Sequence, residues 1–222
     1  MSEPVRAEIV FFDAGGVLVH FPTAEARVAA ALRSLGEERP PEAVGDAVRL
    51  ARAARNEGGP VDLLWPYAVE DERILRAASV LARSLDLPPE TAGYLRDACY
   101  HIRTLALYPD ALPAIAAVRA RGVAVGLISN APGSLPAALH HLGLAEHLRP
   151  LVVSAHVGAV KPDPRIYAEA LRRAGVAEPA RALFIDDLPE NVAGARAAGL
   201  RALQIVRDRG DGLLPLVAEA LA

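Results

Sequence analysis

Five short apolar runs divide the chain, and each is followed by polar or glycine-containing residues. They lie at residues 9–12, 123–128, 151–154, 182–185 and 202–206. Short apolar runs bounded by turn residues are typical of strands that are buried on both faces. The last four runs alternate with stretches at helical spacing, roughly ten residues or longer, and this alternation predicts a parallel, doubly wound, Rossmann-like α/β sheet.

The interval between the first two runs has a different pattern. Alanine, leucine and arginine recur there at helical spacing, interrupted by glycine and proline, and no stretch resembles a strand. We expect three to five helices in a compact bundle, with Thr23 capping the first. The predicted organisation is an α/β core formed by residues 1–19 and 108–222, with an inserted helical bundle at residues 20–107.

Composition narrows the possible partners and compartments. Of the 222 residues 52% are hydrophobic and 23% are charged, and the formal net charge is -3. The chain therefore lacks the basic footprint expected for nucleic acid or an anionic membrane surface. Its one cysteine, Cys99, excludes an internal disulfide framework and fits a buried helical position. No apolar run approaches the ~20 residues of a bilayer span, so we expect a cytoplasmic protein.

Polar side chains follow four of the predicted strands. Asp13 ends the first, Ser129-Asn130 the second and Asp186-Asp187 the fourth, while Lys161 follows the third after a loop. Taken alone, Asp13 is equally compatible with a helix N-cap. Parallel strands share a carboxyl edge, however, so all these groups should converge there. Facing carboxylates repel unless a hard cation such as Mg²⁺ lies between them, and a nearby lysine can hold a phosphate oxygen.

These motifs, in this order, resemble those of the haloacid dehalogenase superfamily of aspartyl-nucleophile hydrolases. The resemblance covers essentially the whole chain and is closest to the branch whose helical cap is inserted after the first core strand. It implies that Asp13 is the nucleophile that accepts a phosphoryl group as an aspartyl phosphate. Ser129 matches the phosphate-binding hydroxyl, Asn130 the residue beside it, and Lys161 the lysine that steadies the nucleophile and the transferred group. All three are expected to bind the phosphate.

The same resemblance implies a Mg²⁺ site. Asp187 matches the metal-ligating acid of the last motif, and Asp13 and the backbone carbonyl of Gly15 complete the implied protein ligands. Asp186 and Asn191 occupy supporting positions, the latter where many members have a second acid. The implied activity is Mg²⁺-dependent hydrolysis of a small phosphorylated metabolite by a monomer or homodimer.

Gly15 is a departure from the family pattern. Most phosphatases of the superfamily have a second aspartate there, two residues after the nucleophile, which acts as general acid and base. A positioned acid/base contributes ~10²–10⁴ in rate. We therefore expect a slower phosphatase, a substrate with a good leaving group, or a substitute proton carrier. His20 is the nearest titratable residue in sequence, although a place in the hinge is the favoured interpretation of it.

Two alternatives follow from this departure. The first is a metal-independent 2-haloacid dehalogenase, whose leaving halide needs no acid. Such enzymes usually have a bulky aromatic residue in place of Gly15 and replace the metal-binding acid with serine and asparagine, so Asp186-Asp187 favours phosphate. The second is a degenerate member that binds a phosphorylated ligand or a partner protein without turnover.

Substrate choice in this family belongs to the cap, which closes over the site and expels water. Arginines at helical spacing are usually solvated, and the single tryptophan is more typical of packing. The residues of the cap that could contact a substrate are the polar and aromatic residues Arg27, Arg49, Arg52, Arg55, Asn56, Trp65, Tyr67, His101 and Arg103.

Overall fold

The chain divides into two compact units. The structure is a computed structural model that describes residues 6–57, 67–99 and 104–221. One unit comprises Met1–His20 and Leu107–Ala222, and the other comprises Phe21–Ala106. These boundaries lie one residue from those expected from the sequence.

A five-stranded sheet forms the centre of the first unit. Its strands are β1 (Ile9–Phe12), β4 (Ala124–Ser129), β5 (Leu151–Val153), β6 (Ala182–Asp186) and β7 (Arg201–Gln204). The spatial order is β5-β4-β1-β6-β7, and every neighbouring pair is parallel. The predicted parallel sheet is therefore confirmed, and the first strand in the chain occupies its middle.

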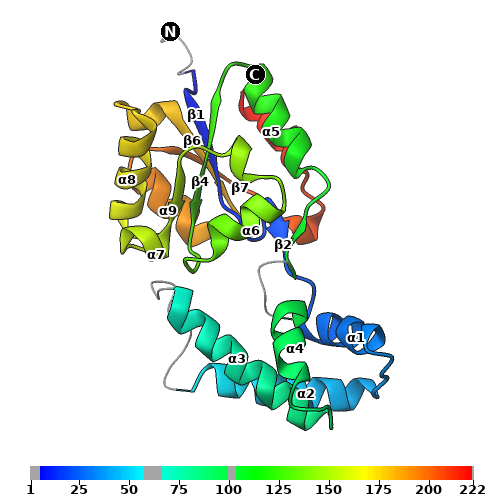
Figure 1. The fold of residues 1–222 in the computed structure, drawn as a ribbon. Helices are drawn as coiled ribbons and strands as arrows, with labels where there is room; N and C mark the ends of the chain where they lie inside the picture. Colours follow the sequence, from blue (N-terminus) through cyan, green and yellow to red (C-terminus); the bar gives the residue numbers. More distant parts are fainter. Residues whose placement is uncertain (1–5, 58–66, 100–103, 222) are drawn as a thin grey trace. The chain divides into compact units, whose positions relative to one another are not determined.

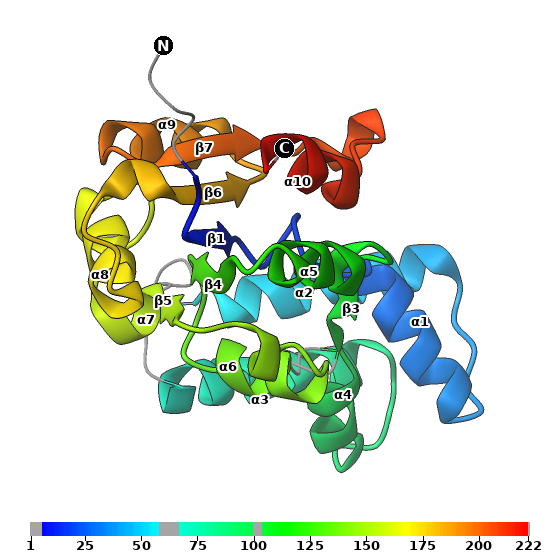
Figure 2. The same ribbon diagram turned by 90° about the horizontal axis from the view of Figure 1, so that it is seen from above.

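Helices cover both faces of this sheet (Figures 1 and 2). The helices α8 (Pro164–Ala174) and α9 (Pro189–Ala197) lie on one face. The other face carries α5 (Ala111–Ala120) and α10 (Leu213–Ala220), which pack against each other. Shorter helical segments complete this unit at α6 (Leu135–His141), α7 (Ser154–Val157), η2 (Ala145–His147), η3 (Pro179–Arg181) and η4 (Arg207–Arg209).

The formation of α8 illustrates how the sequence builds these layers. Asp163 accepts a hydrogen bond from the Arg165 amide at the N-terminus, and Gly175 ends the helix at a φ of +71°. Between these caps, apolar residues recur along one face, and Ile166, Tyr167 and Ala170 are buried there against the sheet. Capping thus sets the length of the helix, and its apolar stripe sets the face that packs.

Close packing brings β1 and β4 together. Phe11 is fully buried, and a Cβ added to its neighbour Gly126 would lie 2.7 Å from the Phe11 ring. Glycine at position 126 therefore provides the space that the phenyl ring of the central strand occupies.

The second unit is helical. Its described residues, 21–57, 67–99 and 104–106, include α1 (Ala24–Ser34), α2 (Pro41–Arg55), α3 (Tyr67–Ser84) and α4 (Thr91–Cys99), and these four α-helices agree with the three to five expected. Thr23 caps α1 through its side chain, as expected, and Cys99 is buried. The core of the unit consists mainly of alanine, valine and leucine, including Val28, Leu81 and Leu95.

One short sheet was not expected from the sequence. The strands β2 (Val19–His20) and β3 (Ala106–Leu107) pair with each other and mark the two crossings between the units. Two residues a strand are too few to produce a periodic signal. No helix in the described ranges has the length and apolar character that a bilayer crossing requires.

Candidate active site

The carboxyl edge of the central strands carries the candidate site. Phe12 pairs with Leu127 of β4 and Ile185 of β6, and the Asp13 amide donates to the Ile185 carbonyl at 2.9 Å. This register brings Asp13 level with Asp186 and close to the end of β4, as the parallel topology predicts.

Lys161 lies at the centre of a buried charge cluster. Its ammonium nitrogen is 2.8 Å from Asp13 Oδ1 and 2.6 Å from Asp186 Oδ2, and it donates to the Ile128 carbonyl at 3.0 Å. The lysine and Asp186 side chains have no exposed surface. Lys161 is also the only lysine among the 24 basic residues of the chain. A compact ammonium suits a position surrounded by two carboxylates and a carbonyl better than a planar guanidinium does.

Asp186 is fully occupied by partners within the protein. Its Oδ1 accepts hydrogen bonds from the Leu188 amide at 2.9 Å and from Asn191 Nδ2 at 3.0 Å, while Oδ2 accepts from Lys161. Asn191 is held in turn by α8, because the Tyr167 hydroxyl donates to its carbonyl at 2.8 Å. Asp186 thus pairs with Lys161, and Asn191 holds Asp186; the supporting roles expected for these two residues stay predictions.

Asn130 holds the backbone of Lys161. Its Nδ2 donates to the Lys161 carbonyl at 2.9 Å, and its Oδ1 accepts from the Lys161 amide at 2.7 Å. Both ends of the Asn130 amide are thus engaged with the segment that carries the lysine. The neighbouring residue, Ser129, is buried, and its hydroxyl forms a hydrogen bond with Asp13 that favours the charged carboxylate.

Three carboxylates lie close together at this edge of the sheet. Asp13, Asp186 and Asp187 each offer a ligand atom, and these atoms lie within 4.8 Å of one another. The buried Asp13 Oδ1 has no hydrogen-bond partner, because its contact with Lys161 lacks hydrogen-bonding geometry and is an ion pair only. Asp187 is half-buried, and no other described residue donates to its carboxylate. Oxygen atoms left in this state fit Mg²⁺, a hard cation that binds through one or two carboxylates.

Burial and mutual repulsion affect the protonation of these acids. Burial raises the pKa of Asp13 above its ordinary value, although the Lys161 charge opposes this effect. Burial, with the added repulsion of Asp13 and Asp186, raises the pKa of Asp187 to about 6. A bound cation would remove this penalty, because it favours the charged carboxylates.

The turn after β1 approaches Asp187 closely. Gly16 has a φ of +73°, and a Cβ at this position would lie 2.4 Å from Asp187 Oδ2. Gly15 differs, because a Cβ there would meet no atom within 4 Å. Position 16 thus requires glycine, whereas position 15 has room for the aspartate that the family pattern would place there.

Two polar residues of this edge were not identified from the sequence. Ser154, at the start of α7, holds the loop after Asn130, since its hydroxyl oxygen accepts from the Ala131 amide at 3.0 Å and donates to the Ala131 carbonyl at 3.1 Å. Arg207 follows β7. Both residues end a predicted strand at the shared carboxyl edge, and this position is the signal that could have identified them.

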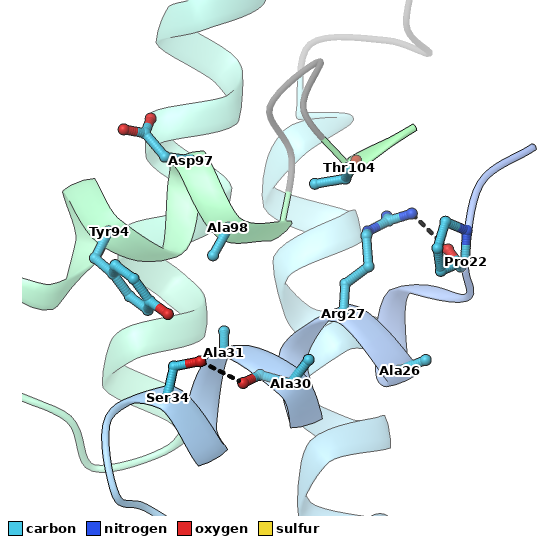
Figure 3. Close-up of a pocket in the computed structure, with 10 residues that line it drawn as sticks. All are labelled: Pro22, Ala26, Arg27, Ala30, Ala31, Ser34, Tyr94, Asp97, Ala98 and Thr104. Atoms are coloured by element: carbon cyan, nitrogen blue, oxygen red, sulfur yellow. Dashed lines mark hydrogen bonds between the residues drawn. The ribbon is translucent and has the colours of Figure 1, made fainter. Parts of the chain in front are cut away.

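The helical unit contains a separate surface pocket of about 410 Å³ (Figure 3). Residues of α1 and α4 line it, and Figure 3 shows Arg27 directed at Pro22, whose carbonyl accepts its Nη1 at 2.6 Å. The pocket contains none of the motif residues, so we place the chemistry at the sheet edge, where the acids and the lysine meet. Of the candidate substrate contacts, Trp65, His101, Arg103 and the Tyr67 side chain lie outside the described residues, whereas Arg49, Arg52 and Asn56 are exposed.

Comparison with known proteins identifies the family of the chain. Residues 7–199 match the model of the haloacid dehalogenase-like hydrolases. The phosphoserine phosphatase of Thermus thermophilus is 36% identical over 192 residues, which cover 83% of this chain and 75% of that protein.

Solved structures show the same fold at low identity. A HAD phosphatase from Thermococcus onnurineus has a TM-score of 0.60 at 22% identity, covering 96% of this chain and 97% of its own. The defluorinating L-2-haloacid dehalogenase Rha0230 has a TM-score of 0.66 at 19% identity, covering 97% and 96%. The fold is thus shared by phosphatases and dehalogenases, and the chain belongs to the haloacid dehalogenase-like hydrolases.

Proposed function

We propose that this protein is a Mg²⁺-dependent phosphatase that hydrolyses a small phosphate monoester through an aspartyl phosphate at Asp13. The observation that carries the proposal is the juxtaposition of Asp13, Lys161 and Asp187. It combines a carboxylate nucleophile, a fixed cation and an acid whose carboxylate no other described residue donates to. The phosphatase name of the Thermus relative supports the same reaction.

In this proposal the residues have separate tasks. Asp13 attacks phosphorus in line, and the bond from phosphorus to the leaving oxygen breaks as the aspartyl phosphate forms. Lys161 fixes the orientation of Asp13 and, with Ser129, offers donors to the transferred oxygens. Asn130 acts by holding the Lys161 backbone, since its amide is already engaged there. Water then hydrolyses the acyl phosphate and regenerates the Asp13 carboxylate.

Asp13, the Gly15 carbonyl and Asp187 are the proposed protein ligands of Mg²⁺. When bound, the metal would neutralise charge on the phosphoryl oxygens and on the two acids. Asp13 Oδ1, which is ion-paired with Lys161 but accepts no hydrogen bond, and the neighbouring Asp187 carboxylate support this assignment. A metal-independent dehalogenase would not need Asp187, a half-buried acid whose carboxylate no other described residue donates to. We therefore place dehalogenation second.

The helical unit is proposed to act as the cap that selects the substrate. This role rests on the family and on the position of the insertion directly after the nucleophile strand. The proposed location is cytoplasmic, and the proposed partner is a small phosphorylated metabolite.

The test is phosphate release from p-nitrophenyl phosphate and from a panel of amino acid, sugar, short acid and nucleotide phosphates that includes O-phosphoserine. Each ester is assayed with Mg²⁺ and with EDTA. Asp13→Asn should abolish turnover, and Asp208→Asn, an exposed aspartate to asparagine change, is the matched control. Turnover that survives EDTA, or halide release from 2-chloropropionate without phosphate release, would contradict the proposal.

A further inference from the structure

Arg207 makes an unusual set of contacts just beyond the end of β7. Its side chain is only 14% exposed. Both terminal nitrogens bind Asp110, with Nη1 2.8 Å from Oδ2 and Nη2 3.0 Å from Oδ1. The guanidinium carbon also lies 4.0 Å from the centre of the Tyr108 ring. The guanidinium therefore forms a bidentate ion pair and an aromatic stack at the same time, a combination that lysine cannot reproduce.

The same guanidinium also contacts the turn that follows the nucleophile. Nη2 donates to the carbonyl of Val17, four residues after Asp13 and two after Gly15. That turn is compact, because the amides of Leu18 and Val19 both donate to the Ala14 carbonyl at 2.9 Å. A shift of the Val17 carbonyl therefore moves the whole turn, including the Gly15 carbonyl.

A second contact fixes the turn from the same side. The Tyr108 amide donates to the Leu18 carbonyl at 3.0 Å. Asp110, the acid that orients Arg207, is itself held by the Leu213 amide at 2.6 Å. Two successive carbonyls of the turn are thus held by the Tyr108–Asp110 segment, one through a backbone amide and the other through Arg207.

We propose that Arg207 is a positioning residue of the active site, which sets the place of the turn carrying Gly15 through its bond to the Val17 carbonyl. The proposal rests on the proposed function, in which the Gly15 carbonyl is a ligand of Mg²⁺. Asp110 and Tyr108 orient the guanidinium for this task. Arg207 itself does not touch the substrate or the reacting atoms.

A merely structural role gives a different expectation. Arg207 would then stabilise only the join between the C-terminal segment and α5, and its loss would lower the melting temperature without changing the site. If Arg207 is a positioning residue, its loss also weakens Mg²⁺ binding and lowers kcat with little change in KM. Residues that orient metal ligands typically contribute about 10–100-fold to metal affinity or activity.

The experiment compares Arg207→Met and Arg207→Lys with Arg209→Met, an exposed arginine in the same short helix. Calorimetric titration of the metal-free proteins with Mg²⁺ gives a readout that does not depend on turnover. It is combined with kcat and KM on p-nitrophenyl phosphate and with a thermal melt. We expect about 10-fold weaker Mg²⁺ binding and about 10-fold lower kcat in Arg207→Met, with Arg209→Met within twofold of wild type.

Arg207→Lys keeps the charge but loses the bidentate pair, so its values should lie closer to those of Arg207→Met than to wild type. It also tests the proposal if Arg207→Met does not fold. The positioning role alone would be overturned if the wild type is active and the folded Arg207 variants bind Mg²⁺ and turn over substrate as well as Arg209→Met does. A wild type without Mg²⁺ binding or turnover would overturn the proposed function, and the positioning role with it.

Discussion

The charged residues at the sheet edge of the first unit differ in burial from those on α2 of the helical unit. At the sheet edge of the first unit Lys161 and Asp186 are fully buried and tightly paired. In the helical unit the ion pair between Arg49 and Asp46 has side chains that are 69% and 71% exposed, and Arg52 is exposed as well. Buried charges must be paired and are costly to disturb, whereas exposed pairs contribute little. The costly buried charges therefore lie at the sheet edge, where the proposed chemistry takes place, whereas the charged pair on α2 is exposed and contributes little to stability.

Removing the central cation is the most severe way to break this comparison. Lys161→Met leaves the Asp13 and Asp186 carboxylates facing each other without the buried ammonium that pairs with both of them. Breaking a buried pair in this way costs about 3–5 kcal/mol of unfolding free energy. Turnover should fall below detection, and chemical denaturation with a phosphatase assay measures both effects.

The double variant Lys161→Met/Asp186→Asn is the control for this experiment, because it removes the unpaired charge as well. It should recover part of the stability without recovering activity. Equal stability of wild type and Lys161→Met would contradict the role of the lysine as the buried counterion.

Adding an acid at position 15 is the next largest change. A side chain there would meet no atom within 4 Å, so Gly15→Asp should fold normally. If the first unit lacks a general acid, the rate should rise about 10²-fold, and more for esters with poor leaving groups. The measurement is kcat/KM for an alkyl phosphate beside p-nitrophenyl phosphate.

Gly15→Asn has nearly the same shape and cannot transfer the proton, so it should give no such gain. A Gly15→Asp variant that is no faster than wild type would indicate that the acid already comes from elsewhere, with the helical unit the first place to look. This outcome would move part of the chemistry out of the sheet edge.

The stability of the metal-free protein should change with pH, by less than the effects of the two substitutions above. The pKa of Asp187 is about 6 in the folded protein, against an ordinary value of 3.8. Between these two pH values the folded state therefore holds a proton on Asp187 that the unfolded state has lost. The stability of the metal-free protein should therefore fall as pH rises from about 4 to about 6. Mg²⁺ competes with this proton, so its affinity should rise over the same range and then level off.

The single lysine makes this titration observable. Labelling with ¹³C-lysine gives a single lysine side-chain environment, at Lys161, which senses the charge of Asp187. We expect its NMR signal to shift near pH 6 and the midpoint to move to lower pH with Mg²⁺. An Asp187→Asn protein whose signal still shifts near pH 6 would assign the titration to another group.

The smallest expected effects are in α2. Arg49→Ala should change the unfolding free energy by less than about 0.5 kcal/mol, because the pair with Asp46 is exposed. KM on the best ester should stay within twofold of wild type. A large rise in KM would show instead that this exposed arginine reaches the substrate.

The sequence predicted the parts of the molecule that depend on local patterns. Apolar runs placed all five core strands, and the acids and the lysine at their ends converge as parallel topology requires. The hydrogen-bond partners of the converging side chains could not be predicted from local patterns. Asn130 was expected at the phosphate, yet its amide holds the Lys161 backbone, a contact between residues far apart in the chain. Arg207 was missed for the same reason, since its partners Asp110 and Val17 are distant in sequence.

The central place of β1 has a consequence for how the protein is made. Ile9 pairs with Ala124 on one side and with Ala182 on the other, so both neighbours of this strand are synthesised long after it. The helical unit, in contrast, consists of consecutive helices whose contacts are local and form quickly. During synthesis the helical unit can therefore assemble before β1 has a partner strand. The surroundings of the nucleophile are complete only after β6 has left the ribosome, because Asp186 and Asp187 come with that strand.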